Sequence, residues 1–367
     1  MMTNFNAYDH EFMSRAIRLA KQGLTTTQPN PRVGCVIVKD NQIIGEGWHK
    51  KAGEAHAEIN ALLKAGQEAQ GATAYVTLEP CSHTGKTPPC ANALIEAGIM
   101  RVVAAMQDPH SKVAGQGFKI LQDAGIAVEV GLLEEQAIQL NPGFIKRMQQ
   151  SLPFVRIKMA MSVDGRTAMA SGESKWITSE AARNDVQHWR AQSCAILTGI
   201  RTVLADDPSL TVRNATHAAA KQPLRVILDS ELQIPLDAKL LQQSGEVLIF
   251  TQHKNAAKIA ELEKMGVKIK CVGNSEQGLN LEQVLQHLAG LEINEVMVEA
   301  GATVAGSFVA TGLVDELVIY MAPTLMGNNA RGLFNLPLID NMNQKLALKI
   351  KDLRQFGDDI RIVASLA

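Results

Sequence analysis

Apolar and polar residues alternate along this chain with the two spacings that distinguish helices from strands. Near the N-terminus, residues 8–22 place apolar side chains at helical spacing, and residues 33–38 form a run apolar enough for a buried strand. A second strand is predicted at 42–47, after an Asp40-Asn41 turn. The alternation continues with predicted helices at 56–68, 90–97 and 117–124 and predicted strands at 74–78, 101–106 and 127–131. This pattern predicts a sheet covered by helices.

The pattern starts again after a break at residues 140–152. That segment contains Asn141-Pro142-Gly143 and is followed by Pro153 and a new apolar strand at 154–161. Further strands are predicted at 195–198, 224–229, 246–250, 267–271 and 295–299, then a helix from about Thr303, then strands at 316–321, 346–353 and 359–363. No segment of helix length clearly separates the last two strands, which predicts antiparallel edge strands on a mostly parallel sheet.

Length and composition support two globular domains, which we place at residues 1–148 and 153–367. A chain of 367 residues exceeds what one hydrophobic core usually supports. A formal net charge of −1 and 4% aromatic residues argue against a nucleic-acid partner. Residues 1–10 lack the features of a signal peptide, and no stretch reaches the roughly 18 apolar residues of a membrane helix. We therefore expect a cytoplasmic protein with no membrane partner.

The five cysteines are too scattered for a disulfide framework. Cys35 and Cys194 lie within or beside apolar runs, and we interpret both as small buried hydrophobic residues. Cys81 and Cys90 differ, because Cys81 directly follows a predicted strand in the segment Glu79-Pro80-Cys81 and Cys90 opens a predicted helix. In a reducing compartment, such cysteines more often bind a metal or take part in catalysis.

His56, Cys81 and Cys90 make a ligand set typical of a catalytic zinc site. One imidazole and two thiolates leave the fourth tetrahedral position for water, whose pKa the metal lowers toward neutrality. Glu58 is the candidate proton shuttle. Side chains two positions apart diverge in a regular helix, so we expect His56 and Glu58 at a first turn. Eight residues, 82–89, separate the cysteines, whereas the zinc-deaminase signature has two.

This long cysteine loop resembles that of the pyrimidine deaminases of riboflavin biosynthesis. The matching segments are Pro29–Gly34, Gly47–His49, Gly53–Glu58 and Thr77–Cys90. The resemblance implies a cytidine-deaminase-like three-layer α/β/α fold, with zinc on His56, Cys81 and Cys90 and with Glu58 as proton donor. It implies a small-molecule substrate, a diaminopyrimidinone carrying a ribosylamino 5-phosphate, which would be held by Asn30, His49, His83 and Lys86. The alternative roles are a solvated loop charge for Lys86 and a turn-supporting amide for Asn30.

The second half of the chain gives weaker signals from its residues alone. Asp164-Gly165 indicates a tight turn, and Thr178-Ser179-Glu180 is typical of a helix cap. The small residues of Glu299–Ser307 join a predicted strand to a predicted helix. Such a turn either exposes backbone N–H groups to a phosphate or allows close helix packing.

Several segments of this half resemble the reductase of the same pathway, namely residues 158–166, 172–177, 203–213 and 299–301. The resemblance implies a dihydrofolate-reductase-like α/β fold and the NADPH-dependent reduction of a ribosylamino group to a ribitylamino group. It implies cofactor contacts from Ala160, Trp176, Thr202, Asp206, Ser230, Gly301, Ala302, Thr303, Val304, Ala305, Gly306 and Ser307. It implies substrate contacts from Ser174, Arg190, Leu210, Arg213 and Glu299.

The chemistry of these residues suggests further roles. The guanidinium groups of Arg190 and Arg213 match a phosphate bidentately, although both could also be surface arginines. Lys158 is expected to polarise or protonate the imine nitrogen, and Asp206 to relay a proton.

The leading prediction is therefore a bifunctional riboflavin-biosynthesis enzyme that uses zinc and NADPH. The alternative enzyme is a nucleoside or nucleic-acid deaminase with an accessory nucleotide-binding domain. A non-enzymatic protein with a structural zinc ion would leave Glu58 without a role, and structural zinc sites usually have four protein ligands. We also expect a homo-oligomer, a dimer or larger, formed through the second domain.

Overall fold

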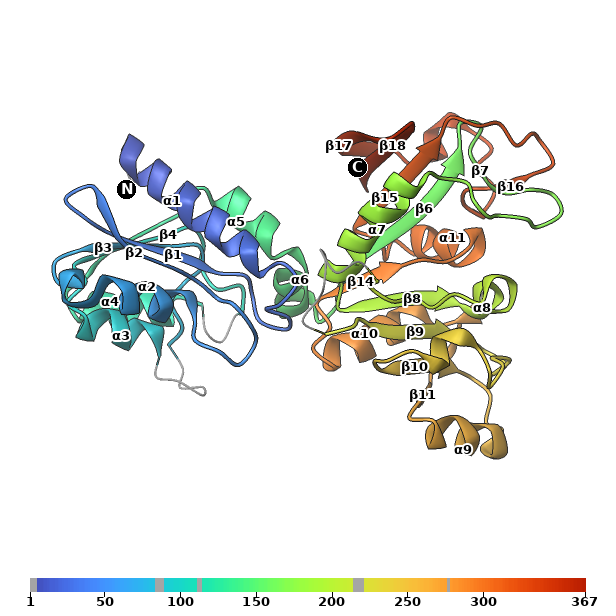
Figure 1. Cartoon of the computed structure of the whole chain (residues 1–367), viewed down its shortest axis with the longest axis horizontal. Helices are drawn as coiled ribbons and strands as arrows, with labels where there is room; N and C mark the ends of the chain where they lie inside the picture. Colours follow the sequence, from blue (N-terminus) through green and yellow to red (C-terminus); the bar gives the residue numbers. More distant parts are fainter. Residues whose placement is uncertain (1–4, 83–88, 111–113, 214–220, 276–277) are drawn as a thin grey trace. The chain divides into compact units, whose positions relative to one another are not determined.

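The computed structural model describes residues 5–82, 89–110, 114–213, 221–275 and 278–367. The chain divides into two compact units, residues 1–151 and 152–367 (Figure 1). Each unit has its own sheet and its own buried apolar clusters. Among the described residues, no helix combines the length and the apolar character that crossing a bilayer demands.

The first unit is a five-stranded sheet between two layers of helices. The strand order is β2-β1-β3-β4-β5, and β3, β4 and β5 are parallel. The strands are β1 (Gly34–Lys39), β2 (Gln42–Trp48), β3 (Thr73–Val76), β4 (Arg101–Ala104) and β5 (Ala127–Val130). Helices α1 (Ala7–Ala20) and α5 (Glu134–Leu140) cover one face, and α2 (Ala57–Ala65), α3 (Cys90–Glu96) and α4 (Gln116–Asp123) cover the other (Figure 1). The predicted three-layer α/β/α fold is confirmed.

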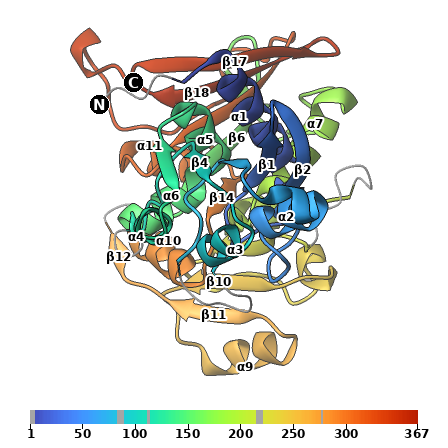
Figure 2. The same cartoon turned by 90° about the vertical axis from the view of Figure 1, so that its left-hand side faces the viewer.

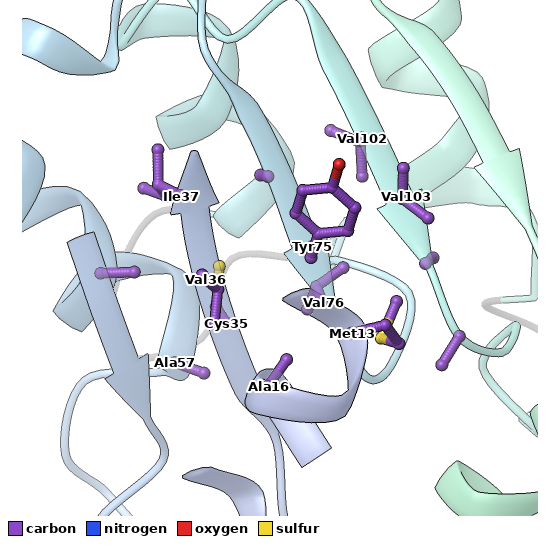
Figure 3. Packing of buried hydrophobic residues seen from close by; sticks show 14 of the residues in the cluster. Met13, Ala16, Cys35, Val36, Ile37, Ala57, Tyr75, Val76, Val102 and Val103 are labelled. Atoms are coloured by element: carbon purple, nitrogen blue, oxygen red, sulfur yellow. The ribbon is translucent and has the colours of Figure 1, made fainter. Parts of the chain in front are cut away.

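The core of this unit forms where α1 packs on β1 and β3. Figure 3 shows Met13 and Ala16 of α1 beside Val36 and Tyr75 of these strands, which are paired directly opposite each other. Cys35 is fully buried, which confirms its interpretation as a small hydrophobic residue, and burial raises the pKa of its thiol. A thiol in that state is a poor nucleophile and a poor metal ligand.

Two glycines let the helices approach the strands of this sheet closely. A side chain at Gly34 would collide with the carbonyl oxygen of Ala16 in α1. A side chain at Gly47, in β2, would collide with the carbonyl oxygen of Ala57 in the first turn of α2. Gly47 therefore sets the distance between the sheet and the helix end that carries His56 and Glu58.

The second unit contains a nine-stranded sheet, whose order is β11-β10-β9-β8-β14-β6-β15-β18-β17. Figure 2 shows this sheet from β11 to β17. The parallel strands are β6 (Phe154–Ser162), β8 (Ala195–Gly199), β9 (Leu224–Leu228), β10 (Val247–Thr251), β11 (Lys268–Cys271), β14 (Glu295–Val298) and β15 (Glu316–Ala322). Strands β17 (Leu348–Phe356) and β18 (Asp359–Leu366) are antiparallel at one edge, as predicted.

The remaining elements of the second unit surround this sheet. Its α-helices are α7 (Glu180–Gln192), α8 (Ile200–Asp206), α9 (Ala256–Lys264), α10 (Leu281–Gly290) and α11 (Ala302–Ala310). Two short ladders pair β7 (Arg166–Ala168) with β16 (Arg331–Gly332) and β12 (Asn274–Ser275) with β13 (Gly278–Leu279). The predicted helix cap is confirmed, because Ser179 accepts a hydrogen bond from the backbone N–H of Ala182 at 3.3 Å.

The last segment of the first unit is helical, where the sequence predicted a break. Helices α5 and α6 (Pro142–Gln150) meet at Asn141. Pro142 is the first residue of α6, a position where the missing N–H would have had no partner within the helix. The Asn141 side chain accepts from the backbone N–H of Arg32 at 2.8 Å and donates to its carbonyl at 2.9 Å. Asn141 thus ends one helix, and Pro142 begins the next helix directly after it.

Candidate active sites

Three candidate metal ligands lie together in the first unit. Nδ1 of His56 lies 3.7 Å from Sγ of Cys81 and 3.3 Å from Sγ of Cys90, and the three ligand atoms all lie within 4.8 Å of one another. Tetrahedral zinc with Zn–S of about 2.3 Å and Zn–N of about 2.0 Å separates a nitrogen from a sulfur ligand by about 3.5 Å. The donor atoms therefore fit a tetrahedral zinc ion.

The ends of two helices position these ligands. His56 is the N-cap of α2, with extended backbone, and Glu58 lies in the first turn, as the two-residue offset predicted. Cys90 is the first residue of α3, and its backbone N–H donates to Sγ of Cys81 at 3.2 Å. Hydrogen bonding from the Cys90 side chain, together with that from His56, lowers the pKa of Cys81 to about 4 against the opposing effect of burial. A thiolate that receives such bonds is ready to bind a metal.

Glu58 is buried beside the ligands with one oxygen unused. Only 3% of the residue is exposed, and Oε2 has no hydrogen-bond partner among the described residues. Burial raises the pKa of Glu58 to about 7, and the positive charge of His56 opposes that shift. A buried carboxylate without a partner is unfavourable for the fold alone. Its position is that of a group which exchanges protons with a bound molecule.

Asn30 and His49 form a hydrogen-bonded pair next to this site. Nδ1 of His49 lies 3.1 Å from the carbonyl oxygen of Ala55, so this nitrogen carries the hydrogen. Nε2 then accepts from Nδ2 of Asn30, at 3.1 Å. This assignment leaves Oδ1 of Asn30 as the acceptor available to a ligand. His49 is 2% exposed, and its geometry is that of a residue that orients Asn30. Its predicted contact with the substrate stays a prediction.

Glu79 is a residue of this site that the sequence analysis missed as a functional residue. Its carboxylate accepts from the backbone N–H groups of Asp108 at 3.1 Å, Gly115 at 2.9 Å and Gly117 at 2.8 Å. These bonds tie the segment before Cys81 to the loop before α4. The sequence signal for this role is the acidic residue directly before Pro80-Cys81. The predicted substrate residues His83 and Lys86 lie outside the described residues.

In the second unit, a cavity of about 810 Å³ lies at the carboxyl ends of the central strands. Open parallel sheets usually bind ligands at this edge. The structure brings twelve of the predicted residues to the cavity wall, namely Lys158, Ala160, Ser174, Thr202, Asp206, Ser230, Glu299, Gly301, Ala302, Thr303, Val304 and Ser307.

Other predicted residues of this unit do not line the cavity. Trp176 is 72% exposed, and the guanidinium of Arg183 lies 4.5 Å from its ring centroid. Ala305 is fully buried in the core, and a side chain at Gly306 would collide with the backbone of Asn335. Ala305 and Gly306 thus take part in helix packing, and their predicted cofactor contact stays a prediction. Leu210 is buried, and its predicted contact with the substrate stays a prediction.

Arg190 has partners within the protein for its guanidinium, and its predicted contact with the substrate stays a prediction. Nε and Nη2 donate to the two carboxylate oxygens of Glu299 at 2.6 and 2.8 Å, and Nη1 donates to the carbonyl oxygen of Thr211 at 3.0 Å. The two parallel N–H donors of the Arg190 guanidinium, which were predicted to match a phosphate, thus form an ion pair with the carboxylate of Glu299. Arg213 is exposed instead, and its charge helps to lower the pKa of Glu299, so it lies close to the cavity.

Lys158 and Glu299 are neighbours of opposite charge at the cavity wall. Burial alone would raise the pKa of Glu299. The positive charges of Arg190 and Lys158 lower it by a larger amount, so the pKa of Glu299 lies below its ordinary value. Burial lowers the pKa of Lys158, and Glu299 partly opposes that shift. A lysine with a lowered pKa gives up a proton more readily than an exposed one.

Asp206 lies at the end of α8, against the segment that carries Ser174. Its carboxylate accepts a long hydrogen bond from Oγ of Ser174 at 3.5 Å and lies 3.8 Å from Nζ of Lys175. The structure thus places Asp206 at the cavity wall, where its predicted proton relay stays a prediction.

Comparison with known proteins identifies both halves of the chain. Residues 6–106 match the family model for the cytidine and deoxycytidylate deaminase zinc-binding region, and residues 153–362 match the RibD C-terminal domain. The riboflavin biosynthesis protein RibD of Escherichia coli is 49% identical over 362 residues, which cover 96% of this chain and 98% of that protein. The chain belongs to the RibD family. RibD of Bacillus amyloliquefaciens is 46% identical over 356 residues, covering 96% of this chain and 95% of that protein.

Solved structures of RibD proteins have the same fold along the whole chain. Acinetobacter baumannii RibD is 50% identical and superimposes with a TM-score of 0.92, over 98% of this chain and 99% of that one. A deaminase/reductase from Thermotoga maritima is 33% identical, with a TM-score of 0.87 over the same shares of the two chains. The predicted family, fold class, enzyme class and cofactors, zinc and NADPH, are confirmed, and the alternative of a deaminase with an accessory domain is not favoured.

Proposed function

We propose that the first unit hydrolyses the amine of a diaminopyrimidinone carrying a ribosylamino 5-phosphate, and that the second unit then reduces the ribosyl group of the product. The observation that carries the first step is the unpartnered oxygen of buried Glu58 next to three atoms spaced for zinc. The Thermotoga maritima relative is described as a diaminohydroxyphosphoribosylaminopyrimidine deaminase and 5-amino-6-(5-phosphoribosylamino)uracil reductase, which supports both steps.

In the deaminase, Glu58 moves the protons. His56, Cys81 and Cys90 would hold zinc, whose Lewis acidity would lower the pKa of the attacking water. The carboxylate of Glu58 takes a proton from this water and passes it to the ring nitrogen. The Glu58 carboxylate then takes the remaining proton of the newly added hydroxyl group and gives it to the leaving amine, so that the C–N bond breaks, ammonia departs and a carbonyl remains on the ring. Oδ1 of Asn30, held in place by His49, accepts a hydrogen bond from the ring or the ribose.

In the reductase, the cavity residues orient two molecules. These residues would hold NADPH, which would supply a hydride for the former anomeric carbon of the ribosylamino group. Nζ of Lys158 donates a proton to the nitrogen of the ring-opened imine. The backbone N–H groups at Gly301–Thr303, where α11 begins, line the cavity and would bind the cofactor pyrophosphate. Arg213 holds the substrate phosphate, and Glu299 accepts from sugar hydroxyl groups.

Removal of zinc tests the division of labour. Treatment with a chelator is expected to lower ammonia release from the deaminase substrate by at least about a hundredfold, because the attacking water loses its activation. Oxidation of NADPH with the deaminated substrate should continue at the untreated rate. Both rates are measured on the full chain, and added zinc should restore the first. Bound zinc without ammonia release from the untreated protein would instead indicate a binding module.

The homo-oligomer is proposed to form through the edge of the nine-stranded sheet. Strand β17 has an unpaired edge, and its side chains Leu348, Ile350 and Leu353 are 46%, 60% and 60% exposed. An open apolar edge favours pairing with a second copy of the chain. Replacing Ile350 and Leu353 by glutamate should lower the mass measured by light scattering to that of a monomer; an unchanged mass would place the interface elsewhere. The thiolate ligands support a reducing, cytoplasmic location, which cell fractionation tests.

A further inference from the structure

The cavity of the second unit has two ends, which the strand order separates. The strands β9, β8, β14 and β6 lie in this order in the sheet. Lys158 and Ala160 of β6, with Glu299 after β14, form one end, where the proposed hydride transfer takes place. Leu228 and Ser230, at and after the end of β9, form the other end together with residues 278–282. The turn at Gly301 begins α11, directly after β14, and lies between them.

This order fixes the direction of a bound nicotinamide dinucleotide. Its reactive ring must lie at the β6 end, next to Lys158. Its pyrophosphate then lies at the turn that begins α11, and its adenosine half reaches the ends of β8 and β9. The apolar side chains there, Leu228, Leu279 and Leu281, suit a purine ring.

The charged residues of the cavity wall distinguish these ends further. Three are acidic, and each has a partner: Glu299 binds Arg190, Asp206 lies near Lys175, and Glu282 accepts from Gln286 at 3.3 Å. The three basic residues of the wall are Lys158, Arg201 and Arg331.

Both arginines have free guanidinium groups. Within the described part of the chain, neither Arg201 nor Arg331 forms a side-chain hydrogen bond or ion pair. Arg331 belongs to β16, which pairs with β7, and its Nη2 would lie 3.2 Å from a Cβ placed on Gly172. It therefore stands near the loop that carries Ser174, at the reaction end. Arg201 is exposed and is the second residue of α8, directly after β8, the strand that lies between β14 and β9 in the sheet.

We propose that Arg201 binds the 2′-phosphate of NADPH and gives the reductase its preference for NADPH over NADH. This inference rests on the proposed reductase function. NADPH and NADH differ only by that phosphate, which lies on the adenosine ribose. An unpaired guanidinium at the mouth of the adenosine end offers the phosphate two parallel N–H donors. The hydroxyl groups of Thr202 and Ser230 line the same end and can complete the contact.

The test uses the full zinc-loaded chain and two adenine nucleotides as probes. Calorimetry measures the affinity for 2′,5′-ADP, which has the 2′-phosphate, and for ADP, which lacks it. Arg201→Ala is expected to lower the affinity for 2′,5′-ADP by roughly tenfold and to leave the affinity for ADP unchanged. Arg201→Lys should retain part of the affinity, since it keeps the charge and loses the fork. Arg331→Ala is the matched control, because it removes a free arginine from the other end.

Steady-state rates give a second, independent reading. The ratio of kcat/KM for NADPH to that for NADH should fall by roughly tenfold in Arg201→Ala. The ratio should stay the same in Arg331→Ala, whatever that change does to the rates. In the wild type the ratio should decrease as salt is added, because salt screens exposed charges.

Two outcomes would overturn the proposal. If Arg201→Ala binds 2′,5′-ADP as tightly as the wild type does, or if Arg331→Ala loses the discrimination instead, the 2′-phosphate lies elsewhere. If the wild type binds neither nucleotide and oxidises no NADPH with the deaminated substrate, the proposed reductase function fails with it. Because Arg201 is exposed and unpaired, its removal should leave the thermal melting temperature unchanged, which confirms folding.

Discussion

Replacing Glu58 by glutamine is expected to lower the kcat of the deaminase by roughly a hundred- to ten-thousand-fold. Glutamine keeps the shape of the side chain but cannot accept the proton of the attacking water. The substitution also removes a buried carboxylate that lacks a partner on Oε2, so the first unit should not lose stability. The measurement is ammonia release by the full chain under saturating substrate.

Three controls make this result specific. Glu54→Gln, an exposed position on the same approach to α2, should leave the deaminase rate unchanged. The zinc content of Glu58→Gln should equal that of the wild type, because the three ligands are intact. NADPH oxidation with the deaminated substrate should also be unaffected. A Glu58→Gln protein that retains most of its deaminase rate would show that another group moves the protons.

Replacing Arg190 by methionine is expected to destabilise the second unit by about 3–5 kcal/mol. The substitution leaves the carboxylate of Glu299, whose side chain is only 11% exposed, without its bidentate partner. The pKa of Glu299 lies below its ordinary value of 4.5 in the folded chain. The pair therefore contributes its full stability at neutral pH, and the contribution is lost as the pH falls through the lowered pKa.

Hydrogen exchange of peptides from residues 152–367, followed as a function of urea, measures this loss within the full chain. Arg354→Met is the matched control: its ion pair with Asp352 is exposed, so its removal should cost at most about 1 kcal/mol. Adding Glu299→Leu to Arg190→Met should restore much of the stability, because no buried charge is then left unpaired. If Arg190→Met alone is as stable as the wild type, the pair is not closed in solution and Arg190 is free to bind a phosphate.

The zinc site could be predicted because its residues lie at the ends of elements that the sequence marks clearly. His56 and Glu58 begin a helix, Cys81 follows a strand and Cys90 begins another helix. Their roles depend on residue type and on these positions, both of which are visible in one sequence. The network of Glu79 could not be predicted, because its three partners are backbone N–H groups 29 to 38 residues away.

The reductase site was predicted less completely, for two physical reasons. The partner of Arg190 is Glu299, 109 residues further along the chain, and no local pattern indicates such a pair. The segment from Gly301 to Ser307 continues from the cavity wall into a helix. Different faces of that helix then meet the cavity and the core, so Ala305 and Gly306 are buried whereas Thr303 and Ser307 line the cavity. The resemblance implied a cofactor contact for every residue of this segment. In a helix, however, only the side chains on one face line the cavity.

The separate cores of the two units have a consequence for the cell. No buried apolar cluster crosses from residues 1–151 to residues 152–367 within the described part of the chain. One message nevertheless encodes both active sites, so translation always supplies them in equal numbers. A mutation that unfolds one core therefore lowers the amount of one active enzyme and not of the other. Loss of the deaminase leads to accumulation of the deaminase substrate, and loss of the reductase leads to accumulation of the deaminated intermediate.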